Sequence, residues 1–458
     1  MNYTPLFPNF TPISSKEWKQ KIQYDLKGAD YNEEMVWESP EGIKVKPFYN
    51  HEDFSKIEHR AKPVFSDWKI AHTITVSSAV EAKSRVTESL KMGAESLFFN
   101  LFNKDTPIEA LISDNDLRAI DLHFNLDFQS NTYIQKLCDF LNKDGALFCV
   151  HIDPINRFAS TGNWFSSQKD DFLNLNKCLD ITKTLSIDSL TYQNAGANMV
   201  QQLAYTLAHA NEYFNLLDTS AIKKSILKVA VGSNYFFEIA KIRALRKLWS
   251  LLAPEFDLPA ECHIIATPSL RNKTVYAYNT NILRTTTEYM SAILGGANTI
   301  GTLPYDSFYH TENRFSNRIA LNQLLLLKNE SHFNFNEDPT YGTYYIENLT
   351  QQLCQKALEL FKQIEASGGF LEQLKAGTIQ KKIRESANKE QAKLENGENS
   401  LVGTNRYTNS EDRMKNQLEV LPFVSKNKRK TLIEPIIAKR LSEKIELERL
   451  LKEGWKAY

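Results

Sequence analysis

The segment RIALNQLLLLKNESHFNFNEDPTYGTYYIENLTQQLCQKALELFKQIEASGGF, residues 318–370, predicts a helix, an ordered connection and a second helix. Leucine and isoleucine dominate the first part, so we expect this helix to be buried around most of its circumference. The connection gathers Asn, Asp, Pro and Gly with three tyrosines between residues 334 and 345, which is typical of turns. The second helix has apolar residues at steps of three and four, and Gly368-Gly369 predict a left-handed end.

Upstream of this segment, short β-rich runs alternate with amphipathic helical periods from about residue 70 to 330. About eight alternations over this length predict an α/β fold, a (β/α)8 TIM barrel. An open doubly wound sheet is the structural rival, but no GxGxxG follows the first expected strand. The expected strands are residues 71–76, 96–101, 118–124, 146–152, 186–191, 226–231, 262–267 and 298–303, and the expected helices include 80–92, 131–142, 199–217, 236–252 and 278–294.

The chain divides into three parts. Residues 1–68 form an N-terminal arm rich in aromatic side chains, and we give equal weight to its burial against the chain's own barrel and against a partner subunit. Residues 69–400 hold the barrel with its C-terminal helices, and residues 401–458 a linker and a C-terminal helix. The linker includes the basic run 426–430, for which plain solvation is favoured over contact with an anion or a CoA phosphate. Apolar residues at steps of four predict a helix over 432–451, packed on the barrel or on a partner.

Bulk properties narrow the class of protein. Lys plus Arg and Asp plus Glu both number 55 in 458 residues, so no net field favours nucleic acid or an anionic membrane surface. The five cysteines are scattered without CxxC spacing, which predicts reduced thiols in the cytoplasm and no metal site. No run approaches the roughly 18 apolar residues that a membrane helix needs. The sequence therefore predicts a soluble cytoplasmic protein.

In a barrel, chemistry is expected where strands end and βα loops begin. Those positions are polar and carry little charge, and no Ser/His/Asp order, HExxH, Walker loop or close carboxylate pair stands out. We therefore assign no catalytic residue and no metal ligand. Four histidines in or beside expected strands, His72, His123, His151 and His263, are interpreted as hydrogen-bonded core or lumen side chains. The expected mouth positions are Ser77, Asn103, Asp153, Gln193, Gly232, Thr267 and Pro304.

Five ordered blocks resemble a known family. They are RIALN, DPTYGTYYIENLT, LFKQIEASGGF, QKKIRESA and NSLVGTNRY, and together they span about ninety residues. In this order they resemble the C-terminal half of the methylmalonyl-CoA mutase barrel. Upstream, residues 234–249 and 281–296 resemble two more segments of the family. The EGI-VKP-Y pattern at residues 41–49 is also similar to the family, where such segments wrap the subunit pair.

Several positions that touch the reacting group in the family differ here. YQNAGAN resembles a segment in which a histidine lies two residues before the Gln; here that position is Thr191. A hydroxyl and a methyl cannot replace an imidazole as partner to a substrate carbonyl. The Tyr of the family's first strand is replaced by Thr73 or Ile74, according to where a gap is placed, and no counterpart aligns with the Arg that holds the substrate carboxylate. We assign a vestigial substrate pocket at Thr73, Ser77, Thr191, Gln193, Lys224 and Ile264.

The resemblance also implies a cofactor and a partner. Catalytic members bind adenosylcobalamin with a domain carrying DxHxxG, and residues 404–458 have no such sequence. We therefore expect a small, non-catalytic subunit that binds no cofactor itself, with adenosylcobalamin held by a large catalytic mutase subunit in a heterodimer. Two alternatives stay open: a catalytic barrel of an acyl-CoA mutase whose cobalamin domain is a separate chain, and a binding protein that kept a CoA-ester channel through its barrel.

Overall fold

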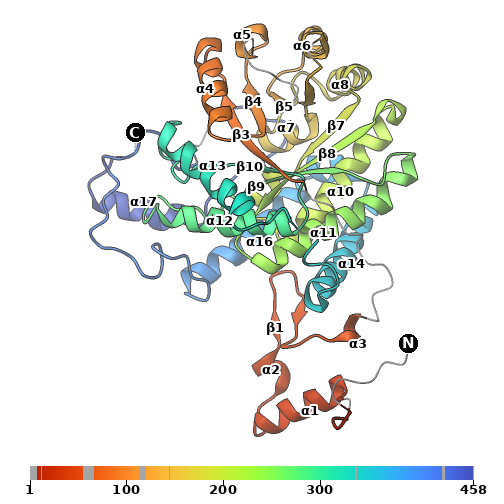
Figure 1. Cartoon of the computed structure of the whole chain (residues 1–458), viewed down its shortest axis with the longest axis vertical. Helices are drawn as coiled ribbons and strands as arrows, with labels where there is room; N and C mark the ends of the chain where they lie inside the picture. The colour runs from red at the N-terminus through yellow and green to blue at the C-terminus, as the bar shows by residue number, and fades with distance from the viewer. Residues whose placement is uncertain are drawn as a thin grey trace.

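Eight parallel strands form one sheet that curls into a nearly closed barrel, which confirms the predicted (β/α)8 class (Figure 1). The computed structural model describes residues 8–11, 13–54, 67–112, 120–143, 145–335, 338–424 and 429–456. The strand order is β6-β5-β4-β3-β10-β9-β8-β7. The strands are β3 (Lys69–Thr75), β4 (Ser96–Leu101), β5 (Asp121–Leu126), β6 (Leu147–His151), β7 (Thr184–Asp188), β8 (Lys224–Val231), β9 (His263–Pro268) and β10 (Thr299–Gly301).

All eight expected strands are present, with two differences that matter for the site. The strand expected at 186–191 ends at Asp188, and Thr191 lies instead on a short helix. The strand expected at 118–124 runs to Leu126, and residues 118 and 119 lie outside the described part of the chain. The first of these strands ends where Asp188 Oδ1 accepts the Leu190 N–H at 3.0 Å and the chain turns into the short helix, and apolar period alone does not detect that.

Helices surround the barrel on its outer side (Figure 1). The main core lies between them and the sheet, because one face of each strand and one stripe of each helix is apolar. Two helices that the sequence did not single out, α7 and α8, fill the space between β6 and β7. The helices of this layer are α4 (Ala79–Lys91), α5 (Glu109–Ile112), α6 (Asn131–Lys143), α7 (Pro154–Thr161), α8 (Gln168–Thr182), α9 (Leu190–Asn194), α10 (Met199–Leu216), α11 (Tyr235–Leu252), α12 (Thr280–Leu294) and α13 (Arg314–Asn329), with short 3₁₀ turns η2 (Thr219–Ala221) and η3 (Ala253–Phe256).

The segment 318–370 forms the expected helix pair, α13 and α14 (Tyr344–Ala366). Gly368 and Gly369 both have positive φ, so the left-handed end is confirmed. The expectation that α13 is buried around most of its circumference is confirmed: between residues 318 and 329 only the stripe Arg318, Asn322, Leu326 and Asn329 is exposed. Two further helices, α15 (Phe370–Lys375) and α16 (Thr378–Glu395), complete this part of the chain.

An ion-pair cluster explains the conspicuous loop before α14. Arg243 on α11 pairs with Asp338 at 2.5 Å and with Glu347 at 2.9 Å, and all three side chains are at most 4% exposed. Two carboxylates around one guanidinium satisfy several of its donors in fixed geometry. The DPTYGTYYIE motif therefore attaches α14 to the barrel helix α11.

The N-terminal arm divides between burial and exposure. Its hairpin, β1 (Trp37–Glu38) and β2 (Lys44–Val45), packs on the chain's own barrel, with Ile43 fully buried and the Trp37 ring 5.7 Å from that of Phe237. Beyond the hairpin, α1 (Ser15–Asp25) buries none of its residues and projects below the barrel (Figure 1). The other arm helices are α2 (Tyr31–Met35) and α3 (His51–Phe54).

The C-terminal segment corrects one prediction. The helix expected over 432–451 forms only as α17 (Glu443–Lys452), and the preceding residues are extended. Pro435 lacks an N–H and disfavours a helical residue before it, which breaks the apolar stripe that suggested a helix. Ile433 and Ile436 are buried in the barrel's main core, so this part of the segment packs on the chain itself, whereas Ile437 of the predicted stripe is 50% exposed. Of the basic run 426–430, only Arg429 and Lys430 are described, and Arg429 donates to the Thr161 carbonyl oxygen at 2.8 Å.

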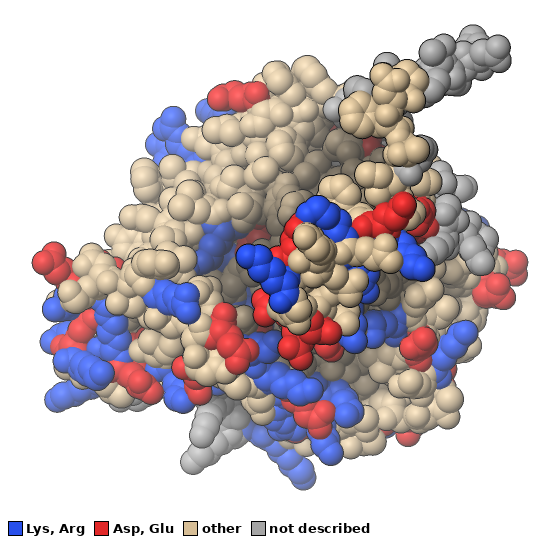
Figure 2. All heavy atoms as spheres, turned by 90° about the horizontal axis from the view of Figure 1, so that it is seen from below, with Lys and Arg blue, Asp and Glu red and all other residues tan. Residues whose placement is uncertain are grey.

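Surface charge is mixed in sign. Figure 2 shows Lys and Arg intermingled with Asp and Glu on the face seen from below. The whole chain has 55 residues of each sign. Among the described residues no helix is long and apolar enough to cross a membrane.

Candidate functional site

The interior of the barrel is filled by side chains at mid-height. Phe98, Cys149, Ile226 and Ile265 point inward with Ala71 and form a cluster separate from the main core, each at most 6% exposed. They come from five different strands, as expected when alternate residues of each strand face the lumen. The lumen is therefore a packed core at this level.

Histidines lie beside this cluster of five lumen residues, which we call the plug. His123 Nδ1 is 2.9 Å from His151 Nε2, and His151 Nδ1 is 2.8 Å from the Ser186 hydroxyl. The His123 ring stacks on Phe98 with centroids 4.2 Å apart. Burial holds the pKa of both histidines well below the usual value, so both are neutral. His72 and His263 likewise bond to Thr302 and Thr299. His263 faces the lumen, whereas His72 lies on the outer face of β3 with Ile70 and Ile74, so the four histidines are hydrogen-bonded core or lumen side chains, as interpreted.

Above the plug, a polar cavity of about 470 Å³ opens at the carboxyl ends of the strands, and we call it the mouth cavity. Lys228 reaches into it from β8 and donates to Asn125 Oδ1, and Asn125 donates to Asn100 Oδ1 at 2.7 Å. Burial lowers the pKa of Lys228, and Asp188 on β7 opposes this shift. Burial raises the pKa of Asp188, against the effect of Lys228. The cavity thus contains the buried cation Lys228 beside the acid Asp188.

Asp153 organises the wall of this cavity. Its Oδ1 accepts hydrogen bonds from Tyr213 OH at 2.6 Å, from the Asn156 N–H at 2.8 Å and from His209 Nε2 at 3.0 Å. Its Oδ2 accepts the Asp188 N–H at 2.7 Å. Burial alone would raise the pKa of Asp153, but His209 and these hydrogen bonds lower it below the usual value. The carboxylate is therefore charged and fully engaged.

The predicted pocket positions do not converge on one site. Thr73 lines the mouth cavity. Thr191 on α9 donates to Asn156 Oδ1 at 2.7 Å behind the cavity wall. Gln193 accepts from the Ser269 hydroxyl at 2.7 Å and lines a different cavity of about 870 Å³, between the arm hairpin, α10 and α16.

The other three predicted positions lie farther away. Ser77 is exposed and donates to Glu81 Oε2 at 2.7 Å. Lys224 begins β8 at the opposite end of the barrel, where its Nζ is 3.5 Å from Cys149 Sγ. Ile264 is fully buried in the main core outside the lumen. Substrate roles for these residues stay predictions.

Two polar residues of this site, Lys228 and His209, were not expected from the sequence. Lys228 interrupts the apolar strand SILKVAV, and this single charge within a strand could have signalled an inward-facing residue. Asp153 and Thr267 were expected at the mouth and do line the cavity. His209 lies within the apolar period of α10, so its partnership with Asp153 had no sequence signal.

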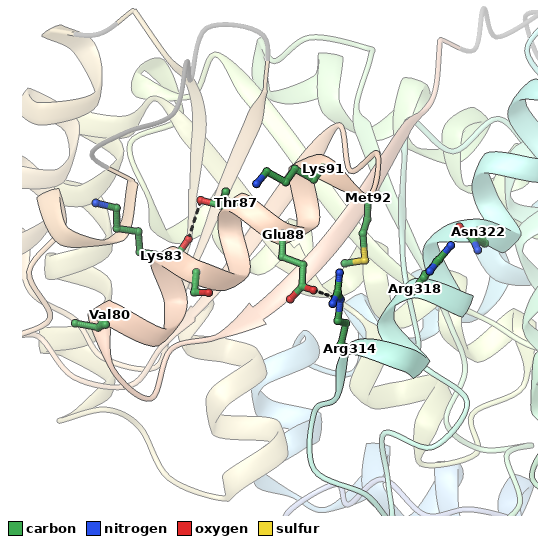
Figure 3. A pocket seen from close by; sticks show the side chains of 10 residues that line it. Val80, Lys83, Thr87, Glu88, Lys91, Met92, Arg314, Arg318 and Asn322 are labelled. Carbon is green, nitrogen blue, oxygen red and sulfur yellow. Dashed lines mark hydrogen bonds and ion pairs between the residues drawn. The ribbon is translucent and has the colours of Figure 1, made fainter.

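A second surface feature lies outside the barrel. A groove of about 840 Å³ separates α4 from α13 and is lined by Lys83, Lys91, Arg314 and Arg318 (Figure 3). Arg314 pairs with Glu88 across it. The groove is basic, open to solvent and remote from the mouth cavity.

The cavity residues do not fit an axial ligand for a corrin cobalt. The imidazole at the mouth, His151, uses both ring nitrogens and is 4% exposed. Within the described ranges, no group of three or more His, Cys, Asp or Glu side chains could hold a metal ion. We therefore derive no step through cobalamin on this chain.

Comparison with known proteins identifies the family. The methylmalonyl-CoA mutase family model matches residues 152–453. The chain is 33% identical to the methylmalonyl-CoA mutase small subunit of Porphyromonas gingivalis, covering 88% of this chain and 71% of that protein. It is 28% identical to the methylmalonyl-CoA mutase of Rhizobium meliloti, over 87% of this chain but 64% of that protein, which is less than two thirds of the relative's length. The methylmalonyl-CoA mutase large subunit of Streptomyces virginiae is 25% identical over 94% of this chain and 66% of that protein. This chain belongs to the methylmalonyl-CoA mutase family.

Proposed function

We propose that this chain is the small, non-catalytic subunit of a heterodimeric methylmalonyl-CoA mutase. In this proposal a large subunit holds adenosylcobalamin and converts methylmalonyl-CoA to succinyl-CoA, and this chain stabilises it. The similarity to a relative named a small subunit, at 33% identity, supports the assignment. The existence of a relative named a large subunit supports a partner of that kind.

The filled lumen is the observation that carries the proposal. A CoA ester that reached the mouth cavity along the barrel axis would have to pass Phe98, Cys149, Ile226 and Ile265, which are packed together and buried. Cores packed at this density leave no room for a chain of atoms without displacing side chains. This argues against a CoA-ester channel that runs through the barrel, in a catalytic barrel or in a binding protein.

The position of the missing imidazole supports the same conclusion. Thr191 uses its hydroxyl to bond Asn156, so it faces the neighbouring helix α7. The buried groups that remain, Lys228 and Asp188, are held by Asn125 and by the Leu190 N–H. A general acid or base has to reach its substrate within hydrogen-bonding distance. We therefore assign these groups to the structure of the barrel.

The arm supplies the argument for a partner. Phe10, Trp18 and Tyr24 are 76%, 53% and 79% exposed around a helix that buries none of its residues. Exposed aromatic side chains gathered on one projecting element mark protein interfaces, where such residues give most of the binding energy. The hairpin behind α1 is fixed on the barrel and would present α1 to the other subunit.

Two measurements test the proposal. Mutase turnover is assayed with the isolated chain plus adenosylcobalamin, with a separately supplied cobalamin-binding subunit, and with a co-expressed large subunit; activity is expected only in the last case. Calorimetry of the isolated chain with methylmalonyl-CoA and with free CoA should show no binding heat. Turnover without a large subunit, or saturable binding of the thioester, would overturn the proposal.

Matched variants test the interface. Trp18→Ala with Tyr24→Ala should weaken co-purification with the large subunit at least tenfold, since truncating interface aromatics costs about 1.4 kcal/mol or more. Phe315→Ala, at an equally exposed aromatic on α13, should leave it unchanged. Equal effects of the two changes would contradict a role for the arm in pairing.

A further inference from the structure

The barrel has one place where backbone hydrogen bonds do not close it. β6 and β7 lie at the two ends of the strand order, and no ladder pairs them in the described structure, so we call this junction the seam. Side chains hold its upper end: His151 bonds Ser186 at 2.8 Å, and Asp153 accepts the Asp188 N–H at 2.7 Å. Every other neighbouring pair of strands is joined by a parallel ladder. The seam is thus the weakest line around the sheet.

One segment of the C-terminal extension, residues 429–441, crosses this seam, and we call it the strap. On the β6 side it lies along α7, the helix that follows β6. The Leu432 and Ile433 N–H groups donate to the Gly162 carbonyl oxygen at 2.9 and 3.3 Å, and the Ile436 N–H donates to the Ala159 carbonyl oxygen at 2.7 Å. Ile433 and Ile436 are 8% and 4% exposed.

On the β7 side the same segment bonds to the next loops. The Lys439 N–H donates to the carbonyl oxygen of Asn194 at 3.0 Å, at the end of the helix α9 that follows β7. The Leu441 N–H donates to the Arg271 carbonyl oxygen at 2.8 Å, and Arg271 returns a bond to the Lys439 carbonyl oxygen at 2.9 Å. The backbone of the strap is therefore hydrogen-bonded to elements on both sides of the seam.

A helix holds the strap from behind. Arg384 on α16 forms a two-pronged pair with Glu434, at 2.6 and 3.1 Å, and Gln380 donates to the Glu434 carbonyl oxygen at 3.1 Å. The wall of the mouth cavity is the other face of α7, where Asn156 and Arg157 line it. The strap therefore also fixes the cavity wall.

We propose that the strap is a clasp that keeps the seam closed, so that the C-terminal extension and not strand pairing decides whether the barrel interior can be reached from the side. With the strap in place, α7 and α9 are held at a fixed separation. With the strap released, α7 loses the backbone bonds and the apolar contacts that the strap supplies, and the β6–β7 junction opens locally while the seven ladders persist.

Glycine at position 162 makes the close approach possible. A Cβ there would lie 2.6 Å from the Ile433 carbonyl oxygen and 2.8 Å from Thr431 Cβ, at a φ of +78°. Gly397 has nearly the same φ, +81°, but a Cβ there would meet nothing within 4 Å. Gly162→Ala therefore displaces the strap and strains the backbone, whereas Gly397→Ala produces the strain alone.

Cys149 reports the state of the seam. It lies in the lumen on β6 and is 6% exposed, whereas Cys262 and Cys354 are buried on other sides of the molecule. The full-length chain is treated with a small thiol-specific reagent under native conditions, and the labelling rate of each cysteine is read by peptide mass spectrometry. Gly162→Ala is expected to label Cys149 roughly tenfold faster than wild type, the factor that ~1.4 kcal/mol of closing free energy produces. Cys262 and Cys354 should be unchanged, and Gly397→Ala should match wild type.

A second pair of variants avoids backbone strain. Ile436→Ala removes a buried anchor of the strap, and Ile437→Ala trims its neighbour, which is 50% exposed. The first change should accelerate labelling of Cys149 and the second should not. The proposal is overturned if neither Gly162→Ala nor Ile436→Ala accelerates Cys149 beyond its control, or if all the cysteines accelerate together, which would show global unfolding. None of these readouts depends on mutase activity or on a partner subunit.

Discussion

Replacing Asp153 by asparagine should destabilise the barrel strongly. The carboxylate accepts four hydrogen bonds, from Tyr213, Asn156, His209 and Asp188, in a site where it is 8% exposed. Asparagine retains one oxygen and places an NH₂ group against at least one donor. With the NH₂ group in the Oδ2 position, the bond from the Asp188 N–H is lost and the other three bonds no longer reach a charged acceptor. One charged bond at roughly 1.5–3 kcal/mol, with about 0.5–1 kcal/mol for each of the three weakened bonds, predicts a loss of about 3–6 kcal/mol in the free energy of unfolding.

The matched control is Asp127→Asn. Asp127 also follows a strand at the mouth and pairs with Arg157 at 2.5 Å, but its side chain is 56% exposed. An exposed pair of this kind contributes less than about 1 kcal/mol. Urea unfolding followed by circular dichroism measures both variants. Equal unfolding midpoints for the two variants would refute the reasoning that Asp153 holds the cavity wall.

The pH dependence gives an independent check. The folded pKa of Asp153 lies below the unfolded value of 3.8, because His209 and the hydrogen bonds outweigh the effect of burial. Its contribution to stability is therefore complete above about pH 4 and is lost as the pH falls through the folded pKa. The difference in stability between wild type and Asp153→Asn should be largest near neutral pH and shrink below pH 4. A difference that stays constant down to pH 2 would contradict the assignment.

Other predictions follow from the same structure. Phe98→Ala should lower the free energy of unfolding by about 3–5 kcal/mol, as a cavity at mid-lumen requires, measured by urea unfolding. Arg243→Met leaves two buried carboxylates without a partner and should cost about 3–5 kcal/mol, against less than about 1 kcal/mol for Arg384→Met at an exposed pair; similar losses would contradict the cluster's role. Burial lowers the pKa of His72 to about 4 from 6.5, so its unfolded form binds more protons in this window and stability should fall as the pH is lowered through it. His72→Gln should flatten that slope in thermal unfolding, and an unchanged slope would contradict it.

The sequence determined the class of fold because the apolar periods are local. Strand runs and helical stripes recur in a fixed rhythm, and each can be read from neighbouring residues. The left-handed turn at Gly368 and Gly369 was predictable for the same reason, because only residues without Cβ adopt that backbone cheaply. The family resemblance also lay in contiguous motifs, which the match to residues 152–453 confirms.

Tertiary structure alone decided the site. Lys224 and Lys228 share one strand, and only the register of β8 with its neighbours shows that the first lies at the far end of the lumen and the second in the mouth cavity. Ile264 and Ile265 likewise divide between the outer core and the lumen.

In the C-terminal segment, contacts with distant residues override a local helix pattern. Its apolar residues at steps of four satisfy a helix pattern, but Pro435 and the carbonyl groups of α7 favour an extended strap. Its partners on α7 and in the loop after it are more than 250 residues away in sequence. Hydrogen bonds between distant segments depend on where the whole chain places them. The sequence by itself therefore determined the elements and the family, and only the folded barrel determined which side chains fill its interior and what closes its seam.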